Sequence, residues 1–143
     1  MKSKEKPIKF SLKQIRTQQF AIIEESYYDK EKSSLSSSFH FGADKGNKII
    51  GVFVSCKFET KKQPFLIIEV RCFFQIEDKD WESLFNSKNN TVHIPKGFIT
   101  HLAMLTVGTT RGVLHAKTEN TPFNRFILPP LNITDYIKED ISL

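Results

Sequence analysis

Two neighbouring apolar runs decide the fold of this chain, and they read IIGVFVSCKFETKKQPFLIIEVRCFFQI from Ile49 to Ile76. In both runs the even-numbered positions are apolar, which is the two-residue period of a β-strand with one buried face. Lys61–Pro64 between the runs is a turn sequence. We therefore predict two antiparallel strands, about Ile49–Glu59 and Phe65–Ile76, that share one core face. The apolar even positions are Ile50, Val52, Val54, Cys56, Phe58, Leu66, Ile68, Val70, Cys72, Phe74 and Ile76.

The odd-numbered positions of these strands mix charged residues with Phe53, Phe65, Ile67 and Phe73. A sheet face that meets only water carries mostly polar residues. We therefore expect the second face to be covered in part by another subunit or by a ligand.

Two further strands are predicted upstream. Apolar residues alternate over Ile8–Leu12 and then change phase, which indicates a β-bulge near Lys13–Gln14. Leu35–Phe41 alternates without interruption and leads into a turn over Gly42–Lys48. The polar stretch Tyr27–Ser34 is predicted to be a loop.

Helix-spaced apolar residues predict a long helix over Gly97–Lys117 that is buried on several sides. Before it, Asp78–Phe85 is predicted as a short helical turn capped by Asp78 or Asp80, and Asn86–Pro95 as a polar loop. The order of elements favours an α+β fold, in which a four-stranded antiparallel sheet is followed by the long helix and a short C-terminal helix.

Prolines shape the last part of the chain. They predict an extended segment over Thr121–Ile133, because Pro122, Pro129 and Pro130 oppose a helix. Asn132 or Thr134 is then expected to cap the final helix, which would run to about Ile141.

The length and composition predict one domain over residues 1–143, with a flexible N-terminus of about residues 1–7. The 13 phenylalanines and 39% hydrophobic residues can form a core, which argues against intrinsic disorder. No stretch is apolar enough to span a membrane, and residues 1–10 lack the features of a secretory signal, so we expect a cytoplasmic protein. The net charge of +5 is spread along the chain, which makes nucleic-acid binding unlikely.

Residues that could carry chemistry are few. Cys56 and Cys72 occupy core positions of their strands, and the four histidines lack metal-ligand spacing. The glycine-rich Gly108–Gly112 falls inside the predicted helix, which is the wrong context for a phosphate-binding loop. We therefore predict no catalytic residues, no metal site, no cofactor and no enzyme activity.

The positive signal is surplus apolar surface. The extended segment adds Phe123, Phe126, Ile127 and Leu128 to the apolar residues of the second sheet face. Large apolar patches usually mark interaction sites, so these residues form either an oligomer interface or a groove for apolar segments. The predicted peptide-binding residues are Phe53, Phe65, Ile67, Phe73, Phe123, Phe126, Ile127 and Leu128.

Several motifs resemble the SecB-type protein export chaperones. Phe10–Thr17 (FSLKQIRT) resembles the first strand of that family, with its change of phase, and Phe65–Val70 (FLIIEV) resembles its fourth strand. A helix that contains Thr110–Gly112 (TRG), followed by Leu128–Ile133 (LPPLNI), resembles its helix and the proline segment after it. The resemblance spans about Phe10 to Ile137.

This resemblance implies a four-stranded antiparallel sheet with two helices, assembled as a dimer of dimers through the first strand and the long helix. It implies an ATP-independent holdase that binds unfolded or precursor polypeptides in apolar grooves. Export members dock the motor SecA through an acidic sheet surface, of which Glu69 matches one carboxylate. Gln19 and Ile23 replace others and the net charge is positive. These departures raise doubt about docking to SecA, and some SecB-like proteins instead stabilise an antitoxin.

Two alternatives remain open at the level of sequence. One is an α+β domain that binds a small apolar ligand in an enclosed pocket. The other, less favoured, is a basic nucleic-acid binder with stacking aromatic residues.

Overall fold

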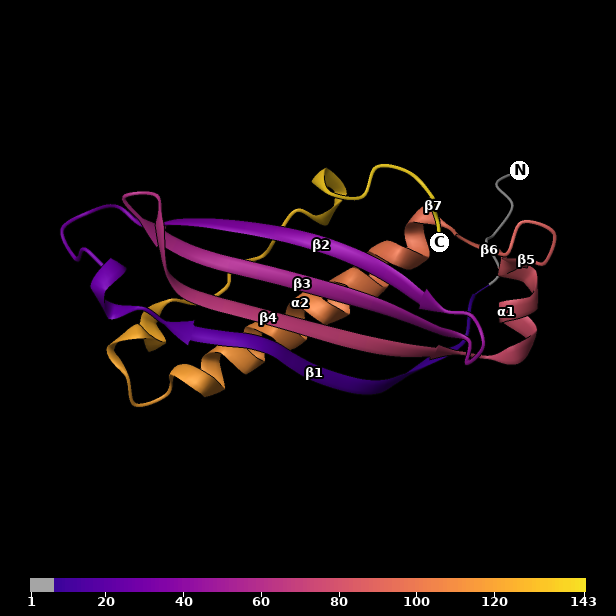
Figure 1. Cartoon of the computed structure of the whole chain (residues 1–143), viewed down its shortest axis with the longest axis horizontal. Coiled ribbons are helices and arrows are strands. Elements are labelled where there is room, and N and C mark those ends of the chain that lie inside the picture. The colour runs from indigo at the N-terminus through magenta and orange to yellow at the C-terminus, as the bar shows by residue number, and fades with distance from the viewer. Residues whose placement is uncertain (1–6) are drawn as a thin grey trace.

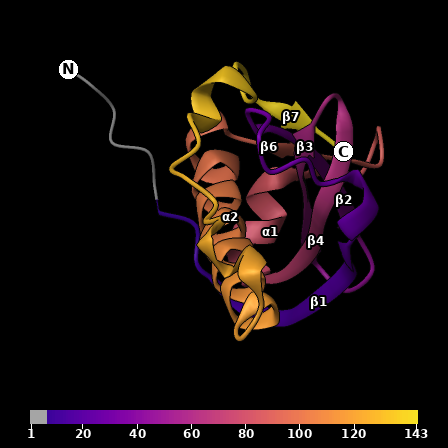
Figure 2. The same ribbon diagram turned by 90° about the vertical axis from the view of Figure 1, so that its left-hand side faces the viewer.

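The computed structural model describes residues 7–143. The predicted flexible N-terminus therefore lies, apart from Pro7, outside the described residues. Figures 1 and 2 show a long, twisted sheet with the helices on one of its faces. In chain order the main elements are β1 (Phe10–Ile22), β2 (Ser34–Asp44), β3 (Ile49–Thr60), β4 (Gln63–Ile76), α1 (Asp78–Leu84) and α2 (Lys96–Thr118).

The sheet has the strand order β1-β4-β3-β2, with every neighbouring pair antiparallel. The inner strands β3 and β4 are those of the quoted stretch, and the turn at Lys61 and Lys62 joins them through two residues with positive φ. This arrangement confirms the predicted α+β fold with a four-stranded antiparallel sheet and a long helix.

One face of the sheet is the core. Every even-numbered apolar position of β3 and β4 is buried there, from Ile50 to Phe58 and from Leu66 to Ile76. α2 packs across these two strands and buries Ile99, Leu102 and Leu114 completely or nearly so. We call this the helix face of the sheet, and the opposite one the open face.

Bulges adjust which side chains reach each face. In β1 the register against β4 shifts between Leu12 and Gln14 and again between Thr17 and Gln19, which confirms the predicted bulge at Lys13–Gln14. A third bulge lies in β4, where Phe58 pairs with Leu66 but the next residue pairs with Pro64. Phe65 is therefore an extra residue.

The bulge in β4 corrects one prediction. Phe65 was assigned by its odd number to the second face, yet it is fully buried and its ring lies 6.5 Å from that of Phe58 on the helix face. An extra residue shifts the alternation by one, so Phe65 points to the same side as the even-numbered positions.

The chain after β4 departs further from the sequence-based expectations. The predicted polar loop Asn86–Pro95 contains two short strands, β5 (Phe85–Asn86) and β6 (Thr91–Ile94), and the C-terminal β7 (Ile141–Ser142) pairs with β6. The expected final helix is only a 3₁₀ turn, η3 (Ile133–Asp135). The pairing of β7 with β6, in which His93 is opposite Ser142, holds the C-terminal residues in an extended conformation.

The cap predicted for α1 is also wrong, whereas Asn132 does hold the N-cap position of η3, without a side-chain capping bond. α1 begins after Glu77 without a side-chain cap, and Asp80 instead accepts a hydrogen bond from the backbone N–H of Lys9 at 2.8 Å. Asp140 accepts a bond from the backbone N–H of Lys96 at 2.8 Å, so a distant residue satisfies the first turn of α2. Such partners are 44 or more residues away and leave no local sequence signal.

Within this chain α2 is buried on one side rather than on several. Its buried residues follow a single stripe, whereas Met104 is 58% exposed and Leu105 is 40% exposed. The buried threonines of the stripe donate hydrogen bonds to carbonyls one turn earlier, as Thr106 does to Leu102 at 2.8 Å. Their hydroxyls are therefore satisfied without a partner on the sheet.

The packing of α2 predicts a contrast between two of its neighbouring residues. Leu102→Ala should lower the free energy of unfolding by about 2–5 kcal/mol, because it leaves a cavity against the sheet. Met104→Ala should change it by less than about 0.5 kcal/mol, since that side chain is mostly in solvent. Urea unfolding followed by circular dichroism measures both, and equal losses would contradict this account of the helix face.

Candidate functional site

The structure divides the eight predicted peptide-binding residues between two surfaces. Phe65, Phe123 and Phe126 meet on the helix face, at the end of α2. Phe53, Ile67 and Phe73 lie on the open face, because they alternate with the buried positions of β3 and β4. Ile127 and Leu128 follow Phe126 in the extended segment. The eight residues therefore do not line one continuous surface, and their role in peptide binding stays a prediction.

Five rings pack together at the end of α2 and form what we call the aromatic cluster: Tyr27, Phe58, Phe65, Phe123 and Phe126. The ring of Phe65 lies at its centre, 4.7 Å from Tyr27 and 5.0 Å from Phe126. Tyr27 belongs to the loop after the 3₁₀ turn η1 (Glu24–Ser26), and no pattern in the sequence marks it as part of a site. The cluster thus joins segments from both halves of the chain.

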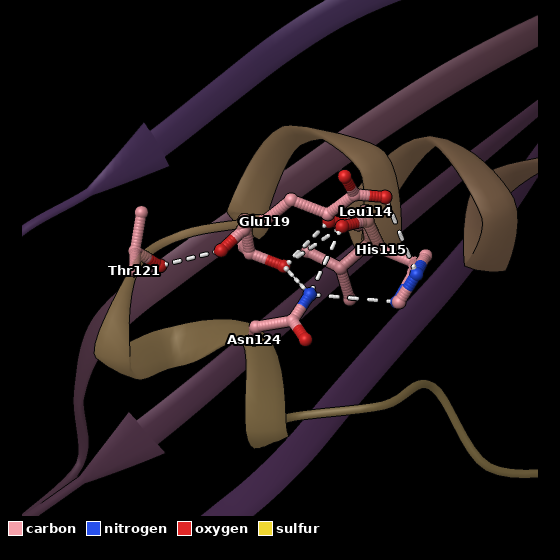
Figure 3. A network of polar contacts seen from close by, with 6 residues as sticks. Leu114, His115, Glu119, Thr121 and Asn124 are labelled. Carbon is pink, nitrogen blue, oxygen red and sulfur yellow. Dashed lines mark hydrogen bonds and ion pairs between the residues drawn. The ribbon is translucent and has the colours of Figure 1, made fainter.

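The turn that carries Phe123 and Phe126 is held against the end of α2 by a polar network (Figure 3). The Asn124 amide donates to the carbonyl of His115 and to the hydroxyl of Thr118, both at 3.1 Å. Thr121 donates to the carbonyl of Thr118 at 2.7 Å and also caps the following 3₁₀ helix, η2 (Pro122–Arg125). Part of the predicted extended segment is therefore helical, because Pro122 occupies a first-turn position that requires no N–H.

Arg111 fixes the path of the chain beyond the cluster. Its guanidinium donates to the carbonyls of Leu128 at 2.6 Å and Pro129 at 3.1 Å. This tether holds the extended segment beside α2 with Leu128 buried and Ile127 62% exposed. Leu128 is consequently a core residue of the folded chain, while Ile127 projects into solvent.

The aromatic cluster is only partly covered. Phe65 and Phe123 are buried, but Tyr27 and Phe126 remain half-buried. Beside them lies a hollow of about 410 Å³ lined by Glu24, Tyr27, Asp29, Pro122, Phe123 and Arg125. The guanidinium of Arg125 lies 5.0 Å from the centre of the Phe126 ring and contacts the Tyr27 hydroxyl. The surface therefore combines exposed apolar area with polar groups at its rim.

The open face holds a second hollow, of about 340 Å³. Gly42 and Gly51 are directly opposite each other there, and Gly51 is also opposite Phe73. Phe53, Phe73 and Arg71 line the hollow together with residues at the ends of β2 and β3. Ile67 lies further along β4 and is 7% exposed, so it contributes little surface.

Glu69, the predicted docking carboxylate, is half-buried on the open face opposite Gln19. Arg71 lies two residues away on the same strand, and Arg16 pairs with Arg71 from β1. Cations thus flank the one carboxylate that matches the acidic surface of the export chaperones. Docking through Glu69 stays a prediction.

The middle of the edge strand β1 is uncovered on both faces, whereas its two ends pack against the core. All of residues 11–19 are exposed, including the apolar Leu12 and Ile15 at 45% and 48%. Figure 1 shows β1 at one border of the sheet, paired only with β4. A long strand with an unpaired edge is a ready template for pairing with another chain.

The two cysteines are buried on the helix face and lie in no chemical site. Burial raises the pKa of the Cys56 thiol to about 12 and also raises the pKa of Cys72. In residues 7–143 no cluster of three or more His, Cys, Asp or Glu side chains is placed to hold a metal ion. Within the same residues, no helix is both long enough and apolar enough to cross a membrane.

No family model matches the sequence, and the search of curated proteins finds no match. Among solved structures, the chain is similar to the SecB-like chaperone Rv1957 of Mycobacterium tuberculosis, in complex with a ChAD peptide from the Rv1956 HigA1 antitoxin. The similarity covers 85% of this chain and 90% of that one, with a TM-score of 0.50 and 12% sequence identity. The chain therefore has a SecB-like fold, as the resemblance of its motifs implied.

The burial of both thiols predicts that neither reacts with a thiol reagent in the native state. Labelling with a chromogenic disulfide at mildly alkaline pH should be slow in buffer and complete in guanidinium chloride, because only the unfolded chain exposes a thiol of ordinary pKa. Ser38→Cys, which adds a thiol at an exposed position of β2, is the control and should react at once. Fast labelling of the unaltered protein would contradict the placement of Cys56 and Cys72.

Proposed function

We propose that this protein is a cytoplasmic, ATP-independent chaperone that holds unfolded segments of other polypeptides. The observation that carries the proposal is a half-covered aromatic cluster, continued by the exposed Ile127, on a SecB-like fold. The neighbour with that fold was solved with a peptide bound, which supports a polypeptide client. No enzymatic step is proposed.

The binding mechanism requires only the burial of apolar surface. Phe126, Ile127 and Tyr27 offer apolar area that a client side chain would cover, at about 25 cal/mol for each Å² removed from water. A single subsite of this size gives weak affinity. Several weak subsites on one client add up through effective concentration, which suits a chaperone that must release its client again.

The rim of this surface favours extended client chains. Glu24, Asp29 and Arg125 border the hollow and can hydrogen bond to peptide N–H and C=O groups. Because the hollow opens to solvent, a segment from the middle of a client polypeptide can enter and leave it without threading a chain end. These features support a polypeptide client over the alternative of a small apolar ligand in an enclosed pocket.

We also propose that the protein acts as a homo-oligomer, a dimer of dimers, in which β1 contacts a second copy. The support is the unpaired edge of β1 together with the exposed Leu12, Ile15 and Leu105. Pairing of two β1 strands would satisfy their free N–H and C=O groups and cover this apolar area.

The client-binding proposal predicts that Ile127→Ser weakens binding of an unfolded test protein about tenfold, because one large apolar contact is lost. Its stability should change by less than about 0.5 kcal/mol, since the side chain is mostly exposed. The measurements are suppression of light scattering by aggregating test protein and affinity for an unfolded polypeptide by fluorescence anisotropy.

Met104→Ser is the matched control. Met104 has a similar exposed fraction, 58% against 62%. It lies ten residues before Leu114, about 15 Å along α2, and so away from the end of the helix where the aromatic cluster packs. We expect it to leave client affinity unchanged. A protein that fails to suppress aggregation at several-fold excess over the test protein would refute the proposed function itself.

The proposed assembly predicts that Ile15→Glu dissociates the oligomer. In a symmetric contact each copy would bring the new carboxylate into the interface, so its burial and like-charge repulsion both oppose association. Light scattering coupled to gel filtration should give a smaller mass for this variant. Ile127→Glu, which adds the same charge at an exposed apolar position outside both β1 and α2, should keep the original mass. A monomeric unaltered protein would refute the assembly.

A further inference from the structure

The open face carries a row of residues that its own chain leaves incomplete. Arg16, Arg71, Phe53 and His40 pair in this order across all four strands of the sheet. The guanidinium of Arg71 lies 5.4 Å from the centre of the Phe53 ring, and that of Arg16 lies 5.8 Å from the ring of Phe73. The phenyl rings thus hold both cations close to the sheet.

Neither arginine has an acidic partner in the part of the chain that the structure describes. They are directly opposite each other on neighbouring strands, a placement in which like charges repel. Among residues 7–143 no ion pair joins either of them to a carboxylate. The two acids on the same part of the open face do not pair with them: Asp44 accepts bonds from Asn47, and Glu69 forms no ion pair among residues 7–143.

The hollow beside this row has an open floor at Gly42. Gly42 and Gly51 face each other across β2 and β3; a Cβ added at Gly42 would meet nothing within 4 Å, whereas one added at Gly51 would contact the Phe73 ring at 3.7 Å. Glycines inside strands weaken a sheet and often mark a place where a ligand approaches closely. Phe53 and Phe73 form the walls, so the hollow suits one large apolar side chain.

We propose that this open-face site binds an extended acidic segment of a partner polypeptide, with one aromatic or large aliphatic side chain in the glycine-floored hollow and a carboxylate on Arg71. Residues two apart in an extended chain lie about 6.7 Å apart on one side. Phe73 and Arg71 are themselves two apart on β4, so hollow and cation have the spacing of such a segment. The partner motif is therefore an apolar residue two positions from Asp or Glu.

Charge distribution favours a peptide over a nucleic acid at this site. Asp44 lines one end of the hollow, and Glu69 follows Arg71 on its other side. A continuous chain of phosphates would meet these carboxylates, whereas a peptide brings a single charge to Arg71 and a neutral group to the hollow. The site lies on the opposite face of the sheet from the aromatic cluster, so the proposal does not rest on client binding there.

The test uses the full-length protein and two fluorescein-labelled peptides, Gly-Ser-Glu-Ser-Phe-Ser-Gly and Gly-Ser-Phe-Ser-Glu-Ser-Gly, which present the motif with its single carboxylate in the two chain directions. Anisotropy should show saturable binding that weakens with salt. Arg71→Gln should weaken it about tenfold, because a charge-assisted hydrogen bond is lost. Arg71→Lys should recover part of the affinity, since it keeps the charge but not the two-pronged geometry.

A second variant tests the hollow independently of charge. Gly42→Val fills the floor at an exposed strand position where added atoms have room, so the fold should be kept while peptide affinity falls. Lys79→Gln, which removes a cation from an exposed position of α1, is the control and should bind as the unaltered protein does. Suppression of aggregation should be the same in all these variants, which separates this site from the proposed chaperone activity.

Three results would overturn the proposal. The first is no saturable binding of either peptide to the unaltered protein. The second is equal affinity for a peptide with Gln in place of its Glu, or unchanged affinity in Arg71→Gln. The third is tighter binding of a single-stranded oligonucleotide that displaces the peptide and depends on the same arginine, which would assign the site to nucleic acid.

Discussion

The packing of α2 against β3 and β4 is the contact on which the rest of the structure depends. Strands β3 and β4 present an uninterrupted apolar face, and a face of that size is not stable in water. α2 alone supplies a stripe long enough to cover it, with Ile99 at one end and Leu114 near the other. The packing of α2 across β3 and β4 then sets the positions of the segments that precede and follow the helix.

The same crossing explains why both candidate surfaces are open. A single helix covers two strands, so the outer strand β1 keeps residues 11–19 exposed. No helix or strand among residues 7–143 covers the opposite face of the sheet. At the far end of α2 the chain turns back through Pro122 and places Phe126 at the border of the core. Exposed apolar area is therefore a direct result of an architecture with few layers.

Patterns with a short period were predictable from the sequence, and contacts that depend on distant partners were not. The alternation in β3 and β4 predicted their buried face residue by residue, and the change of phase in β1 predicted its bulge. Phe65 was misplaced, because a bulge in β4 depends on how the neighbouring strand pairs. β7 was missed for the same reason, since two residues that pair with a strand 47 or more positions earlier carry no period of their own.

The arginines of the open face show that strand register decides which charges of the sequence lie next to each other. In the sequence Arg16 and Arg71 are 55 positions apart and contribute only two units to a modest net charge of +5. Register brings them opposite each other and stacks them on Phe73 and Phe53. The repulsion between Arg16 and Arg71 lowers the stability of the free protein. An anion that binds beside them would relieve this repulsion, and this gain contributes to the affinity proposed for an acidic partner. Because this pair and the aromatic cluster lie on opposite faces, occupation of one leaves the other accessible.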